Sequence, residues 1–86
     1  MNIKYNNTTY TIPKPFDECY FGSNPTKELT VMNPYSKDSC KLPAFAVAIY
    51  DTIMGNDVLG FDEDISYKGK DWFQKNFVKQ YYTLLD

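Results

Sequence analysis

Residues 43–54 are apolar around nearly the whole circumference of the helix that they predict. Pro43 fits the first turn of such a helix, and Gly55-Asn56 provides a stop after Met54. A helix of this kind is stable only when other elements cover most of its surface. A chain of 86 residues has enough apolar surface for one core. We therefore expect this helix to be buried within a single domain that spans residues 1–86.

Residues 1–12 predict a β-hairpin, because Asn6-Asn7 can take the two positive-φ positions of a type I′ turn between β-prone flanks. A two-residue loop pairs Tyr5 with Thr8 and continues in that register along both strands. Six side chains then share the face that we expect to join the core: Met1, Ile3, Tyr5, Thr8, Tyr10 and Ile12.

A second hairpin is predicted from Glu28 onward, where apolar and polar residues alternate on both sides of a turn at residues 33–38. Its strands place Thr30 and Lys41 toward solvent. Residues 16–26 between the hairpins predict a loop that Phe16, Tyr20 or Phe21 anchors. The inward positions of the second hairpin are Leu29, Val31, Cys40 and Leu42.

Residues 57–70 are interpreted as a linker, and residues 71–85 as a second helix capped by Asp71. Four apolar residues follow helical spacing in that helix: Phe73, Phe77, Tyr81 and Leu84. The expected fold is an α+β domain in which two β-hairpins form a small antiparallel sheet packed against two α-helices.

The chain contains neither Arg nor His, and its formal net charge is −2. Without the arginine fork an acidic chain is a poor nucleic-acid binder, and without histidine it lacks the usual proton carrier and metal ligand. We predict no enzyme, no cofactor and no metal site. For Cys19 and Cys40 two free thiols are preferred, with one disulfide as the alternative.

Two groups of residues are candidates for binding a partner. The first mixes aromatic and basic side chains: Tyr67, Trp72, Lys75 and Lys79. Trp72 falls beside the apolar stripe, so it either is partly exposed or covers the edge of the core. The second group is the acidic run Asp62, Glu63 and Asp64, which lacks the spacing of a calcium loop. That run is either a solvated loop or a contact for a basic partner surface.

Five short segments together resemble small uncharacterised proteins of tailed phages: Asn33-Pro34-Tyr35-Ser36, Leu42-Pro43, Val47-Ala48-Ile49-Tyr50-Asp51, Ile53-Met54-Gly55, and the end from Asp71-Trp72-Phe73 to Leu84-Leu85-Asp86. The resemblance brings no established activity. It implies a small factor that binds and inhibits a host protein, or an accessory part of a virion.

The composition, the tyrosines and the resemblance together predict a non-catalytic protein-binding module, monomeric or a small homo-oligomer. The alternatives are a minor structural protein that self-associates and a nucleic-acid-associated accessory protein. No segment has the profile of a signal peptide or a membrane span. We therefore expect a soluble protein of the cytoplasm, the host cytoplasm if the origin is viral.

Overall fold

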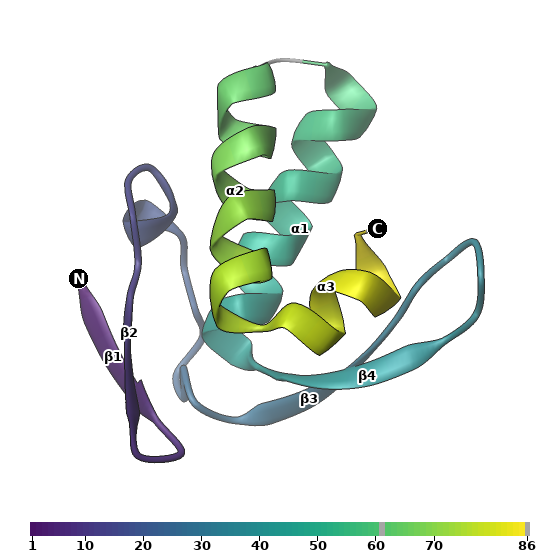
Figure 1. Ribbon diagram of the computed structural model, residues 1–86. Helices are drawn as coiled ribbons and strands as arrows, with labels where there is room; N and C mark the ends of the chain where they lie inside the picture. Colours follow the sequence, from purple (N-terminus) through teal and green to yellow (C-terminus); the bar gives the residue numbers. More distant parts are fainter. Residues whose placement is uncertain (61, 86) are drawn as a thin grey trace.

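A computed structural model describes residues 1–60 and 62–85 as two β-hairpins, one 3-10 turn and three helices (Figure 1). The elements in chain order are β1 (Asn2–Tyr5), β2 (Thr8–Thr11), the 3-10 turn η1 (Phe16–Glu18), β3 (Glu28–Met32), β4 (Ser39–Pro43), α1 (Ala44–Leu59), α2 (Glu63–Asn76) and α3 (Val78–Leu84). This architecture confirms the expected α+β class.

The β1–β2 hairpin has the predicted turn and register. Asn6 and Asn7 both have positive φ angles, of 49° and 63°, as a type I′ turn requires. Tyr5 lies opposite Thr8. The Ile12 amide donates to the Met1 carbonyl at 2.8 Å, which extends the ladder beyond the strands. Ile12 is buried, but Met1 and Thr8 are exposed, so the inward face is narrower than we expected.

In the β3–β4 hairpin Leu29 lies opposite Leu42, and Thr30 and Lys41 face solvent as predicted. The buried side chain of Asn33 organises its turn. Asn33 Oδ1 accepts the Tyr35 amide at 2.8 Å, and Asn33 Nδ2 donates to the Thr83 carbonyl at 2.9 Å. This turn is therefore tied to the last helix.

The two hairpins form separate two-stranded sheets, so our expectation of one shared sheet was wrong. Tyrosine side chains of the first hairpin pack on aromatic residues of the helical part of the core. The Tyr10 ring stacks on Phe77 at a centroid distance of 4.9 Å, and Tyr5 meets Phe45 edge to face at 6.2 Å. The hairpins thus join through side chains packed on the helices rather than through a backbone ladder.

Helix α1 continues through Gly55-Asn56 and ends at Gly60, so the predicted stop was wrong. Gly60 has a φ of 66° and donates its amide to the Asn56 carbonyl at 2.7 Å, which is the usual chemistry of a glycine helix end. Gly55 is an interior residue of the helix, and a Cβ added to it would contact no other atom within 4 Å. A single glycine weakens a helix by only about 1 kcal/mol and does not by itself end one.

The region from residue 57 onward differs most from the prediction. Instead of a linker followed by one helix, α2 begins at Glu63 and the chain bends at Phe77 before α3. Asp62 is the N-cap, because its Oδ1 accepts the Asp64 amide at 2.9 Å. Asp71, the predicted cap, lies inside α2. The acidic run thus occupies a helix start, where carboxylates complement the helix dipole.

Residues 44–54 of α1 are covered on most sides, as their composition predicted, whereas residues 57–59 at its end are exposed. Figure 1 shows α2 running alongside α1 above the β3–β4 hairpin. Phe45 and Ile53 of α1 are fully buried. A Cβ at Gly69 of α2 would collide with the Ile53 side chain and approach the Phe16 ring to 3.1 Å. Gly69 therefore sets how closely α2 packs on the core.

Both cysteines are free and half-buried. Cys19 Sγ lies 3.4 Å from Thr52 Oγ1, whereas Cys40 lies opposite Val31 in the β3–β4 hairpin. Burial raises the pKa of the Cys40 thiol, so its reactive thiolate form is disfavoured near neutral pH.

Candidate functional site

Tyr67 lies on the exposed side of α2, with 74% of its surface accessible. It stands between two hollows and contributes to the wall of both. One hollow has a volume of about 390 Å³ and the other about 470 Å³. The helix therefore presents an aromatic ring with a concave surface on either side, and the two hollows differ in charge.

The first hollow, called here the acidic hollow, lies where α1 passes into α2. Its wall is formed by Asn56, Asp57, Gly60, Asp62, Glu63, Ser66, Tyr67 and Lys70. Three carboxylates face one lysine in this set. The predicted residues Asp62 and Glu63 are thus brought beside Tyr67, whereas Asp64 is exposed but lies outside the wall.

A small network orders the floor of the acidic hollow. Ser66 Oγ donates to Asp57 Oδ1 at 2.5 Å, and Lys70 Nζ lies 3.2 Å from Asp57 Oδ2. The Ser66 hydrogen bond, and after it the Lys70 charge, hold the pKa of Asp57 below its usual value. A carboxylate with a lowered pKa is a weaker base, so this geometry orders Ser66 without activating it as a nucleophile.

The turn between α1 and α2 is held by one side chain. Asn56 Nδ2 donates to the Asp62 carbonyl at 2.6 Å, and Asn56 Oδ1 accepts the Asp62 amide at 3.1 Å. These two bonds fix the Asp62 backbone against the end of α1. The carboxylates of the acidic hollow are therefore presented by an ordered backbone.

The second hollow, called here the lysine hollow, lies between α2 and the segment that leaves β2. Its wall is formed by Pro13, Lys14, Tyr67, Lys68, Asp71, Trp72, Lys75 and Asn76. Three lysines face one aspartate, and Lys75 Nζ pairs with Asp71 Oδ2 at 3.0 Å. Of the predicted residues, Tyr67, Trp72 and Lys75 meet here.

Trp72 is buried, with only 6% of its surface exposed, so the expectation of partial exposure was wrong and the alternative of a core-covering ring holds. Its Nε1 donates to the Thr11 carbonyl at 2.8 Å, and its ring meets Phe73 edge to face at a centroid distance of 5.2 Å. Trp72 therefore supports the lysine hollow from below and offers a partner little surface.

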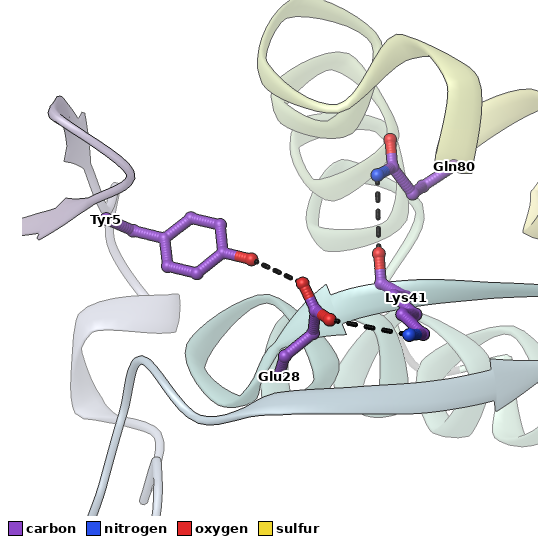
Figure 2. A network of polar contacts seen from close by, with 4 residues as sticks. All are labelled: Tyr5, Glu28, Lys41 and Gln80. Carbon is purple, nitrogen blue, oxygen red and sulfur yellow. Dashed lines mark hydrogen bonds and ion pairs between the residues drawn. The ribbon is translucent and has the colours of Figure 1, made fainter.

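Lys79 lies apart from the other candidates. It lines a groove between the two hairpins and α3, next to a polar network shown in Figure 2. There Tyr5 donates to Glu28 at 3.1 Å, Lys41 Nζ lies 3.8 Å from Glu28, and Gln80 donates to the Lys41 carbonyl at 3.3 Å (Figure 2). These contacts join four elements, β1, β3, β4 and α3. Lys79 itself belongs to α3, so it lies outside the α2 surface.

Several residues of the two hollows were not among the predicted binding residues. Ser66 and Lys70 lie one turn apart on α2, at a spacing that a helix over residues 63–76 would have indicated. Asp57 lies in the supposed linker. Lys14 comes from a different part of the chain, and no local pattern connects it to α2.

The described part of the chain contains neither a metal-binding cluster of side chains nor a membrane-spanning helix. Among residues 1–60 and 62–85, no three His, Cys, Asp or Glu side chains converge so that they could hold a metal ion. Within the same residues, no helix is long and apolar enough to cross a membrane.

Comparison of the chain with protein-family models, with curated proteins and with solved structures finds no match in any of the three. No relative assigns it a function. The resemblance to tailed-phage proteins therefore stays a prediction, and the candidate function rests on the surface of α2.

Proposed function

We propose that this protein is a non-catalytic binding module that recognises another protein through the exposed side of α2. The observation that carries the proposal is Tyr67, whose largely accessible ring stands between the acidic hollow and the lysine hollow. Tyrosine offers a large contact area with few rotatable bonds, and it is enriched among the residues that dominate protein interfaces.

The charges on either side of Tyr67 favour a protein partner over nucleic acid. A phosphate backbone that followed the helix would meet the carboxylates of Asp57, Asp62 and Glu63. A folded protein can instead present a basic patch to the acidic hollow and an acidic patch to the lysine hollow. Such a pattern orients the partner and excludes the reverse orientation.

The proposal includes the biological setting that the sequence predicts. The partner is a host protein that the chain inhibits or modulates, and the meeting place is the cytoplasm, the host cytoplasm if the chain is viral. The support for this part is the phage resemblance alone. Identification of neighbouring genes tests it, because replication or defence genes fit a host-directed factor, whereas a surrounding cluster of virion genes contradicts it.

The binding surface is tested by comparing three proteins: the wild type, Tyr67→Ala and Tyr20→Ala. Tyr20 is the matched control, because it is 86% exposed and forms no part of either hollow. Each protein is immobilised and exposed to host lysate, and captured proteins are quantified by mass spectrometry. We expect Tyr67→Ala to reduce capture of a specific partner by about tenfold or more, as loss of an interface anchor does. Equal capture by all three proteins would contradict the proposal.

Self-association is the second candidate function, and one observation favours it. Val58 and Leu59 at the end of α1 are 78% and 63% exposed. Val58 lines a hollow of about 550 Å³ together with Tyr35 and Leu85. Light scattering of the wild type, Val58→Glu and the charge-matched control Gln74→Glu tests this idea. An oligomer that only Val58→Glu dissociates supports self-association, and a wild-type monomer excludes it.

A further inference from the structure

We infer that the lysine hollow binds a short acidic peptide segment of the partner protein. This inference rests on the proposed function and names the chemistry of one part of the partner. It starts from the charge of the hollow, where Lys14, Lys68 and Lys75 face the single carboxylate of Asp71. An excess of two positive charges thus gathers on a protein whose net charge is −2.

The helix dipole explains only part of this clustering. Lys75 lies in the last turn of α2, where the dipole favours a cation. Lys14 comes from the segment after β2, so its place beside the α2 lysines is set by the tertiary fold. Repulsion between the clustered lysines destabilises the folded state. An anionic partner that neutralises these charges removes the repulsion and stabilises the complex.

Two of the three lysines are available to a partner. Lys14 and Lys68 are exposed, and within residues 1–60 and 62–85 neither forms an ion pair. The third, Lys75, already pairs with Asp71 at 3.0 Å. The hollow therefore has room for at least two carboxylates of a partner without breaking an existing contact.

The hollow also has an apolar side, which distinguishes it from a simple charged surface. The exposed ring of Tyr67, the half-buried ring of Pro13 and the buried ring of Trp72 all line it. An aliphatic side chain between two acidic residues matches this arrangement. The α2 wall runs from Tyr67 to Asn76, a rise of about 14 Å, which about four residues of extended peptide would cover.

An acidic peptide fits better than a nucleic-acid strand. The acidic hollow lies on the other side of Tyr67, and its Asp62 and Glu63 repel a phosphate chain that extends in that direction. A peptide segment can carry negative charge over four residues and then change to neutral or basic residues. The probe for the test is therefore the blocked peptide acetyl-Glu-Glu-Leu-Glu-Glu-amide.

The test titrates this peptide into the isotopically labelled full chain and follows backbone amide shifts by NMR at low and high salt. We expect shifts confined to Lys14 and residues 67–76, weakened by salt. The variant Lys14→Gln/Lys68→Gln should weaken binding by about fivefold, the size expected when two exposed charge pairs are removed. The control Lys4→Gln/Lys27→Gln makes the same charge change at exposed sites outside the hollow and should bind like wild type.

Each other outcome overturns the inference. These outcomes are no shifts, shifts elsewhere on the surface, equal binding of acetyl-Lys-Lys-Leu-Lys-Lys-amide, or binding of a five-nucleotide oligothymidylate in place of the acidic peptide. The last outcome would assign the hollow to nucleic acid. If a partner is captured in a Tyr67-dependent way and one of these results is also obtained, the proposed function stands. Only the inference that the partner presents an acidic segment is then rejected.

Discussion

The indole Nε1 of Trp72 donates a 2.8 Å hydrogen bond to the backbone carbonyl of Thr11, a residue 61 positions away in the chain. This bond attaches the β1–β2 hairpin to α2. The Tyr10 ring strengthens this attachment by stacking on Phe77 at the end of α2, whereas the Tyr5 hydroxyl donates to Glu28 of β3 and so joins the two hairpins. A binding surface on α2 therefore depends on side-chain contacts that the N-terminal hairpin makes with the helices.

Replacing Trp72 with Phe should weaken this attachment while keeping an aromatic ring in place. The Thr11 carbonyl loses its indole donor, and part of the ring's buried area is lost. We expect the free energy of unfolding to fall by about 1–3 kcal/mol. Urea unfolding followed by circular dichroism measures this change, since the variant has no tryptophan to report by fluorescence. Tyr20→Phe, at an exposed aromatic position, is the control, and equal stability of the two variants would contradict the prediction.

The two helical glycines should respond to alanine with opposite signs. A Cβ at Gly69 collides with Ile53, so Gly69→Ala should destabilise the protein by about 1–3 kcal/mol through overpacking. A Cβ at Gly55 meets nothing within 4 Å, so Gly55→Ala should stabilise α1 by about 0.5–1 kcal/mol. Thermal unfolding of both variants checks the pair. A Gly69→Ala protein as stable as wild type would show that α2 does not pack tightly on Ile53 at this position.

The Asp57 contact with Ser66 and Lys70 should make stability depend on pH in one direction. The pKa of Asp57 is lowered in the folded state, so its stabilising effect is present above the unfolded pKa and is lost as pH falls through the folded value. Asp57→Asn should therefore be less stable than wild type near pH 7, and the difference should shrink toward about pH 3. Urea unfolding over this range measures it.

The control for the Asp57 experiment is Asp38→Asn, because the exposed Asp38 carboxylate forms no hydrogen bond or ion pair with the rest of the described chain. Its effect on stability should change little between the two ends of the range. A difference between wild type and Asp57→Asn that grows as the pH falls would reverse the sign and contradict the assigned cause.

Local patterns predicted both hairpins, because turn geometry and side-chain alternation act between neighbours. Asn6-Asn7 sets the register of the first hairpin. The same reasoning failed at the helix ends. The run from Asp62 to Asp64 was interpreted as a loop because it is highly charged, yet those charges suit the first turn of a helix.

The candidate site was predicted in part. Tyr67 and the acidic residues Asp62 and Glu63 do lie together, because they share one end of α2. Trp72 could not be placed, since a tryptophan beside an apolar stripe is equally suited to the core edge and to the surface. Lys14 was missed because its contribution depends on where the chain leaves the first hairpin.

The sequence by itself determined the α+β class, the register of the first hairpin, the inward and outward positions of the second, and the burial of the apolar part of α1. These features depend on turn residues, periodicity and the need to cover apolar surface. The tertiary structure decided that the hairpins form separate sheets, that the chain bends at Phe77, and that Trp72 is buried. It also placed Lys14 beside α2. These features depend on contacts between residues far apart in the chain, and the free energy of such contacts is set by packing that no local pattern specifies.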